Sequence, residues 1–206
     1  MEVLAPRERV FRFDRPTLNP EWRWLNPPPV WQIDPAAPGL IIQPADRTDF
    51  WQETHYGFRA DNGHFLYTEI EGDFSISTRV RFRPAHQYDQ AGLMIRSGPL
   101  SWIKTSVEYE PDGPSRLGAV VTNRGYSDWS VQNFPCDKSE VCLRIRKEGL
   151  DFIIEFASEE NSDWTLMRIA HLDRESNGPL SCGVYACSPK GAGFRAEFAF
   201  VRITCA

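Results

Sequence analysis

The chain has 206 residues, of which 41% are apolar and 13% aromatic, and its formal net charge at pH 7 is −5. This length allows one large domain with a sizeable core, and the acidic balance argues against nucleic acid or an acidic membrane surface as a partner. No apolar run suits a secretion signal or a membrane-spanning helix of ~20 residues, so we expect a cytoplasmic protein.

Residues 1–44 are rich in proline and tryptophan, most densely in LNPEWRWLNPPPVWQIDP, which contains Trp22, Trp24 and Trp31. Proline lacks a backbone N–H and fixes φ, so this stretch is not expected to form a central strand. So many indoles also argue against disorder. We predict an N-terminal arm that packs on a sheet formed by residues 45–206, within a single domain overall.

Two signals follow the arm. The stretch GLIIQPA (39–45) predicts a short strand, and Asn62-Gly63 is a turn signal because both residues tolerate positive φ. Residues 72–84 then alternate between apolar and polar side chains, as in a half-buried antiparallel strand. The residues expected on the buried face of that strand are Phe74, Ile76, Thr78, Val80 and Phe82.

Further strands follow at short intervals, and no long stretch shows helical periodicity. A hairpin is predicted around Glu148-Gly149, and helix is expected only as a turn or two near 172–177. Phe194, Phe198 and Phe200 share parity, so alternation places them on one face of the strand predicted at 193–204. Many short strands separated by turn signals are typical of an all-β sandwich. The predicted strands cover residues 91–96, 101–110, 117–123, 141–149, 150–160, 163–172, 178–189 and 193–204.

The cysteines and histidines do not form a recognisable metal or disulfide pattern. The five cysteines are an odd number without a short CxxC pair, which argues against both a disulfide framework and a zinc site. We expect most of them to be buried thiols. The four histidines show no ligand spacing, and no calcium-loop motif is present. No metal and no cofactor are therefore predicted, although a structural calcium is left open by analogy with other sandwiches.

The stretch SWIKTSVEYE (101–110) is the most informative part of the sequence. Alternation places Trp102, Lys104, Ser106 and Glu108 on one face and the apolar positions on the other. The polar face suits a sugar, because indole rings stack on a pyranose while charged groups and amides bind its hydroxyls. The candidate ligand-binding residues, including those from neighbouring stretches, are Gln90, Trp102, Lys104, Glu108, Thr122, Tyr126, Asp128 and Trp129.

A simpler interpretation stands beside this one. The polar face of an antiparallel sheet is most often only solvated. Trp129 is then a core or rim indole bonded to backbone, and Asp128 caps a turn.

A combination of motifs carries a family resemblance. YDQAGLMIR, WIKTSVEYE and VVTNRGYSDWS occur in this order after DFWQ and GDFSISTRVRF. The combination resembles the regulation-of-enolase-protein family, a domain family of otherwise unknown function, and more distantly the sandwich accessory domain of some β-xylosidases. It covers residues 45 to 205. The resemblance implies a concanavalin A-like jelly-roll sandwich of two antiparallel sheets with one concave face, and it favours a site at 88 to 130.

Three functions are compatible with these features. The first is non-catalytic binding of a carbohydrate or small sugar metabolite on the concave face, in the regulation of sugar metabolism. The second is regulation of a metabolic enzyme that binds the arm or the groove rim. The third is weak glycoside hydrolysis by Glu108 with Asp128 or Glu110, although the third carboxylate of laminarinase-like sandwich enzymes is absent.

Overall fold

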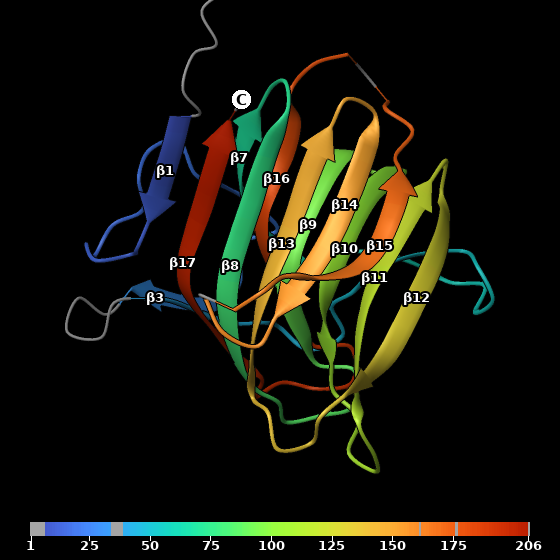
Figure 1. Cartoon of the computed structure of the whole chain (residues 1–206). Coiled ribbons are helices and arrows are strands. Elements are labelled where there is room, and N and C mark those ends of the chain that lie inside the picture. Colours follow the sequence, from blue (N-terminus) through green and yellow to red (C-terminus); the bar gives the residue numbers. More distant parts are fainter. Residues whose placement is uncertain (1–6, 34–38, 161, 176, 206) are drawn as a thin grey trace, which may run out of the picture.

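A computed structural model describes residues 7–33, 39–160, 162–175 and 177–205. All regular elements in these residues are strands, and no helix occurs among them. Figure 1 shows two large antiparallel sheets packed face to face. The predicted all-β, concanavalin A-like jelly-roll sandwich is thereby confirmed.

The sheet in front in Figure 1 has eight strands. They are β1 (Arg7–Phe11), β3 (Val30–Ile33), β4 (Leu40–Gln43), β8 (Phe74–Arg83), β13 (Glu140–Glu148), β14 (Asp151–Ala157), β15 (Thr165–His171) and β17 (Arg195–Cys205). The order is β15-β14-β13-β8-β17-β4-β3, and β1 also pairs with β17. β13 and β14 form the predicted hairpin, with Gly149 in the left-handed region at φ 61°.

The second sheet has seven strands. They are β2 (Arg23–Leu25), β7 (His64–Ile70), β9 (Gln90–Gly98), β10 (Ser101–Glu108), β11 (Ser115–Asn123), β12 (Tyr126–Phe134) and β16 (Leu180–Cys187). The order is β12-β11-β10-β9-β16-β7-β2, so β10 lies inside the sheet and β12 at its edge. A separate two-stranded hairpin consists of β5 (Phe50–Gln52) and β6 (Arg59–Asp61).

The core lies between the two large sheets, where the alternating positions of the sequence meet. On β8, Phe74, Ile76 and Val80 are almost fully buried, as their spacing predicts. They join Ile103 and Val107 of β10 in one apolar cluster. This cluster fixes which face of β10 points into the sandwich, and therefore which face is left for a site.

The described part of the N-terminal arm contributes strands to both sheets. β1 pairs with β17, β2 with β7, and β3 with β4. Trp22 is buried in the main core, and Trp24 and Trp31 pack against it. Residues 1–6 and 34–38 of the arm lie outside the described residues. A boundary between arm and domain at residue 44 stays a prediction.

Two local expectations are wrong. Residues 172–175 form no helix, and the predicted turn also includes residue 176, which lies outside the described residues. On β17, a bulge between Phe198 and Phe200 shifts the register against β8. Phe198 therefore faces the core together with Val201, whereas the ring of Phe200 lies under the guanidinium of Arg202.

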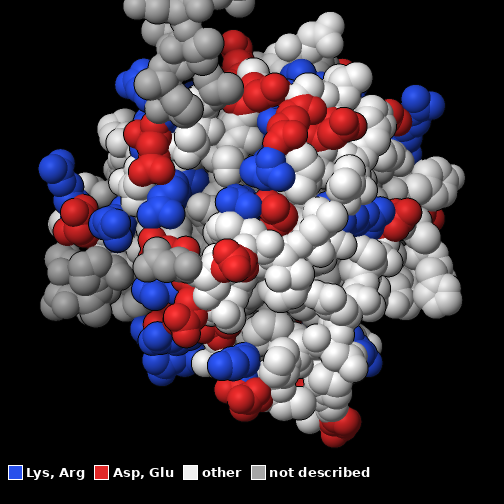
Figure 2. Space-filling view, viewed as in Figure 1, with Lys and Arg blue, Asp and Glu red and all other residues white. Residues whose placement is uncertain are grey.

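The outer face of the eight-stranded sheet is charged and mixed in sign. Figure 2 shows basic and acidic groups interspersed over it. Arg81 pairs with Glu140 at 3.0 Å and Arg83 with Glu197 at 3.3 Å, so these two arginines of β8 face solvent beside their acidic partners. Such a face is a solvated surface. No helix long and apolar enough to cross a bilayer occurs in the described residues.

Candidate functional site

The outer face of the seven-stranded sheet carries a second, smaller core. Trp102 and Lys104 of β10 point to this face, because their neighbours Ile103 and Thr105 point into the sandwich. Trp102 lies opposite Thr122 of β11 and Arg96 of β9. The alternation predicted for this strand is therefore confirmed for these four residues.

The hairpin β5–β6 covers part of that face. Phe50 packs edge-on against Trp102 and Tyr185, with ring centroids 6.2 Å apart in each pair. Trp51 packs edge-on against Trp129 of β12 at 6.5 Å. These contacts hold the hairpin on the sheet by burying aromatic surface. The buried members of this second core are Phe50, Trp51, Phe65, Met94, Trp102, Val120, Tyr185 and Cys187.

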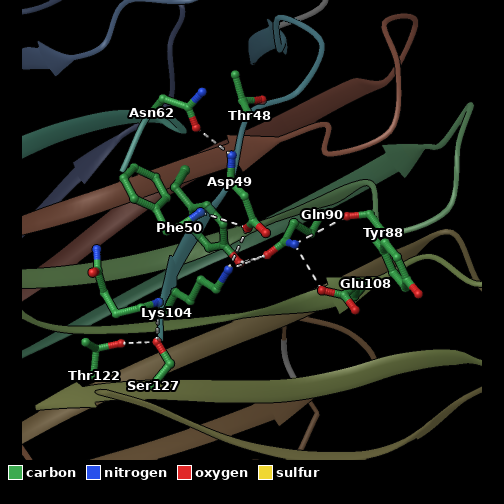
Figure 3. Close-up of polar contacts among 12 residues, drawn as sticks. Thr48, Asp49, Phe50, Asn62, Tyr88, Gln90, Lys104, Glu108, Thr122 and Ser127 are labelled. Carbon is green, nitrogen blue, oxygen red and sulfur yellow. Dashed lines mark hydrogen bonds and ion pairs between the residues drawn. The ribbon is translucent and has the colours of Figure 1, made fainter. Parts of the chain in front are cut away.

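A chain of polar side chains runs beside the second core (Figure 3). Lys104 Nζ lies 3.2 Å from Asp49 Oδ1 and donates to Gln90 Oε1 at 2.9 Å. Gln90 Nε2 in turn donates to Glu108 Oε2 at 3.0 Å. The Tyr185 hydroxyl also donates to Gln90 Oε1, at 3.1 Å. Gln90 thus links an ammonium, a phenol and a carboxyl group within one network.

Burial makes this network strongly electrostatic. The side chain of Lys104 is 4% exposed and that of Asp49 18%. Asp49 Oδ1 also accepts from the backbone N–H of Phe50 at 2.7 Å, while its own N–H donates to Asn62 Oδ1 at 3.0 Å. The carboxylate that balances Lys104 is therefore held in place by the start of the hairpin, rather than by the sheet.

Glu108 has a perturbed carboxyl group. Burial, reinforced by the negative charges of Asp49 and Glu110, raises its pKa to about 8 against the opposing effect of Lys104. At neutral pH the group is mostly protonated, so it can donate a hydrogen bond as well as accept one. Perturbed carboxyl groups of this kind cluster at functional sites.

A pocket of about 450 Å³ opens over these groups. Its floor includes Lys104 and Glu108, and its walls are largely aromatic. A concave site with apolar walls and a few converging polar groups is the usual form of a small-molecule site. The lining residues are Arg47, Asp49, Trp51, Tyr56, Phe58, Ala60, Tyr88, Lys104, Glu108, Val120, Trp129, Pro189 and Lys190.

The predicted site residues fall into several groups. Lys104, Glu108 and Trp129 line the pocket, and Gln90 lies beneath it in the polar network. Trp102 is completely buried under the hairpin and does not line the pocket. Thr122 is also buried, and its hydroxyl bonds to Ser127 at 2.8 Å. Trp102 and Thr122 therefore lie in the layer that supports the pocket.

The remaining two predicted site residues, Tyr126 and Asp128, do not line the main pocket. Tyr126 is 67% exposed at the edge of β12. Asp128 has the opposite parity to Trp129, and its carboxylate pairs with Arg168 of β15 at 3.0 Å. Both residues border an adjoining hollow of about 460 Å³, which also touches Tyr56 and Trp129. A ligand-binding role for each of the eight residues stays a prediction.

The carboxylate pairs nominated for hydrolysis are not brought together in the pocket. Asp128 is turned toward the eight-stranded sheet, and Glu110 accepts from Gln87 Nε2 at 2.8 Å without lining the pocket. The acidic residue that lines the pocket with Glu108 is Asp49. Among the described residues, no cluster of three or more potential metal ligands is present.

Residues 47–60 contribute to the pocket, which the sequence pattern did not indicate. Asp49, Trp51, Tyr56 and Phe58 all line the pocket, yet they lie in or beside a hairpin that pairs with neither large sheet. The available signal was a dense group of aromatic residues just before the Asn62-Gly63 turn. Nothing in the local pattern indicated that this group folds across β10.

Comparisons with known proteins identify relatives along most of the chain. The profile of a family described as "Protein of unknown function (DUF1349)" matches residues 24–205. Regulation of enolase protein 1 from Saccharomyces cerevisiae is 34% identical over 175 residues, which are 85% of each chain. The crystal structure of a functionally unknown protein from Saccharomyces cerevisiae superposes with a TM-score of 0.81 at 32% identity, covering 90% of this chain and 97% of the other.

More distant structures share the fold. A Bacteroides ovatus protein described as Xyloglucan PUL GH43B gives a TM-score of 0.76 at 18% identity, and the match covers all of this chain but 41% of that protein. At this identity the likeness concerns architecture alone. The resemblance predicted from the sequence motifs is confirmed: the chain belongs to the DUF1349 family and is related to Regulation of enolase protein 1.

Proposed function

We propose that this protein binds a small carbohydrate or sugar-derived metabolite in the pocket of the seven-stranded sheet, without catalysing a reaction on it. The observation that carries the proposal is the combination of aromatic walls with a buried polar floor. Trp51 and Trp129 offer apolar ring faces, while Lys104, Asp49 and Glu108 offer charged and neutral hydrogen-bonding groups. Sugars present these two kinds of surface together.

The floor has hydrogen-bonding capacity to spare. Lys104 uses two of its three N–H groups on Asp49 and Gln90. Among the described residues, Asp49 Oδ2 and Glu108 Oε1 have no protein partner. The floor thus retains a donor, an acceptor and a carboxyl group that can do either, which suits neighbouring hydroxyl groups.

Calorimetric titration with a panel of neutral and charged mono- and disaccharides tests this proposal. Trp129→Ala should weaken binding of the best sugar about tenfold or more, because it removes the ring on which the sugar stacks; ring stacking on aromatic side chains contributes on the order of 1–3 kcal/mol. Trp164→Ala is the matched control, because that half-buried indole lies under Arg144 on the other sheet. Failure of every sugar to bind at millimolar concentration would reject the proposal.

A second function is regulation of a metabolic enzyme through protein contact. The name of the Saccharomyces cerevisiae relative points to enolase, and this chain exposes two aromatic side chains at the pocket rim. Tyr56 is 55% and Phe58 44% exposed, and large exposed aromatic groups are common in protein interfaces. We place either function, sugar binding or contact with a metabolic enzyme, in the regulation of metabolism in the cytoplasm.

Purified enolase provides the direct test of the second function. Binding measured by light scattering or surface plasmon resonance should weaken in a Tyr56→Ser, Phe58→Ser double variant and persist in Leu150→Ser. Leu150 is similarly exposed at 66%, but it lies in the turn between β13 and β14. Absence of binding to enolase, with intact sugar binding, leaves only the first function.

A further inference from the structure

Two cationic side chains stand at the mouth of the pocket. Arg47 precedes β5 and Lys190 follows β16, and both line the pocket. The Arg47 side chain is 87% exposed, and its ion pair with the adjacent Asp46 is long, at 3.8 Å. Lys190 Nζ lies 5.4 Å from the centre of the Tyr88 ring and forms no ion pair with any described residue.

The charges lining the pocket do not balance. Three basic residues, Arg47, Lys104 and Lys190, face two acidic ones, Asp49 and Glu108. Asp49 is committed to Lys104 at 3.2 Å. Glu108 is mostly uncharged at neutral pH because burial raises its pKa to about 8. An excess of positive charge therefore remains at the mouth, where an incoming ligand meets it first.

The positions of these groups divide the pocket by depth. The hydrogen-bonding floor is nearly closed to solvent, since Lys104 is 3% exposed, whereas both mouth cations extend into water. The two loops adjoin, since Asp46 and Ser188 form a β-bridge beside Arg47 and Lys190. A guanidinium and an ammonium on adjoining loops suit phosphate or carboxylate oxygens. The aromatic walls between the two levels suit the carbon skeleton of a sugar.

We propose that the ligand of this pocket is an anionic sugar, one that bears a phosphate or a carboxylate group. Arg47 and Lys190 bind the anionic group at the mouth, while Asp49, Lys104 and Glu108 bind the hydroxyls at the floor. This inference rests on the proposed function and narrows it to one class of sugar.

The test compares matched ligands by calorimetry: glucose, glucose 6-phosphate, glucuronate, inorganic phosphate, and the corresponding galactose and mannose series. At least one sugar phosphate or sugar acid should bind about tenfold or more tightly than its neutral parent. The phosphate and acid arms separate the two sources of negative charge. The gain should disappear in an Arg47→Gln, Lys190→Gln variant, and Lys138→Gln is the control because it removes a cation from the exposed loop between β12 and β13.

The contrary outcomes separate failure of the anionic-sugar inference from failure of the proposed function. Equal or tighter binding of the neutral parents would overturn the anionic-sugar inference and leave sugar binding intact. Equal binding of inorganic phosphate and the sugar phosphates would also overturn it, since the floor would then contribute nothing. No binding by any sugar would remove the proposed function together with this inference. An unchanged gain in the double variant, with its fold verified by circular dichroism, would show that Arg47 and Lys190 do not bind the anion.

Discussion

Asp49 and Lys104 form a 3.2 Å ion pair although they are 55 positions apart in the chain. The pair ties the start of the hairpin β5–β6 to the centre of the seven-stranded sheet, and it is nearly closed to solvent. Removing one partner of such a pair leaves a buried charge without compensation, whereas removing both does not.

Asp49→Ala should therefore destabilise the protein by about 3 kcal/mol or more, because Lys104 remains buried and charged. Adding Lys104→Met should recover much of that loss. Urea denaturation of the two single variants and the double variant measures the coupling between them. Additive effects would show that the two side chains do not interact in solution.

The raised pKa of Glu108 predicts a pH-dependent stability. Its ordinary value is 4.5 and its value in the folded protein is about 8, so between these values the unfolded chain ionises while the folded chain stays protonated. Stability from this group is fully present below pH 4.5 and is lost progressively as pH rises toward about 8. Each unit of difference between the two pKa values corresponds to about 1.4 kcal/mol.

Glu108→Gln should remove this dependence. Stability measured in urea across the same pH range should fall more steeply for the natural protein than for the variant. Lys104, Asp49, Glu110 and Gln90 surround the carboxyl group and are unchanged in this comparison. Parallel pH profiles would mean that Glu108 ionises normally in the folded state.

Two tryptophans on the same face should respond differently to substitution. Trp102 is 0% exposed under Phe50, so Trp102→Ala should cost about 3–5 kcal/mol in stability. Trp129 is half-buried in the pocket wall, so Trp129→Ala should cost less stability. Thermal denaturation of both variants gives the comparison, and a similar loss in each would contradict the layered arrangement.

Thiol labelling should separate the cysteines by burial. Cys136 is exposed, Cys205 is partly buried, and Cys142, Cys182 and Cys187 are buried. Burial raises the pKa of Cys182 and Cys187 well above its ordinary value, which also suppresses the reactive thiolate. In the native protein Cys136 should react rapidly and Cys205 slowly with a disulfide reagent. Rapid labelling of all five positions without denaturant would contradict this order.

The N-terminal segment should be needed for solubility as well as stability. β1 and β3 cover backbone groups of β17 and β4, and β2 covers the edge of β7. Removing residues 1–38 would expose these edges, and open strand edges promote aggregation. Size-exclusion chromatography should show oligomers or precipitation. A monodisperse, equally stable truncated protein would show that β1, β2 and β3 are not needed for solubility or stability.

The sequence was most informative where side chains alternate in regular strands. Parity alone placed Lys104 and Glu108 on the face opposite the core, and Phe74, Ile76 and Val80 within it. Parity did not distinguish Trp102 from Trp129, because a covering hairpin decides their exposure. It also failed at Phe200, where a bulge interrupts the alternation.

Most of the site features that the sequence did not predict depend on contacts between segments that are distant in the chain. Asp49 reaches Lys104 only after the hairpin folds over the sheet, and Asp128 turns to Arg168 of the other sheet. The mouth cations Arg47 and Lys190 are 143 residues apart by their numbers and come from two loops without regular structure. Local patterns carry no information about such encounters.

The position of β17 has a consequence for synthesis on the ribosome. β17 lies between β8 and β4, and Thr78 Oγ1 donates to the carbonyl of Phe200, 122 residues further along. The nascent chain must therefore carry β8 with one open edge until β17 emerges. Closure of the eight-stranded sheet then becomes a late folding step. Until it occurs, the unpaired edge of β8 is exposed to aggregation, which a chaperone can prevent.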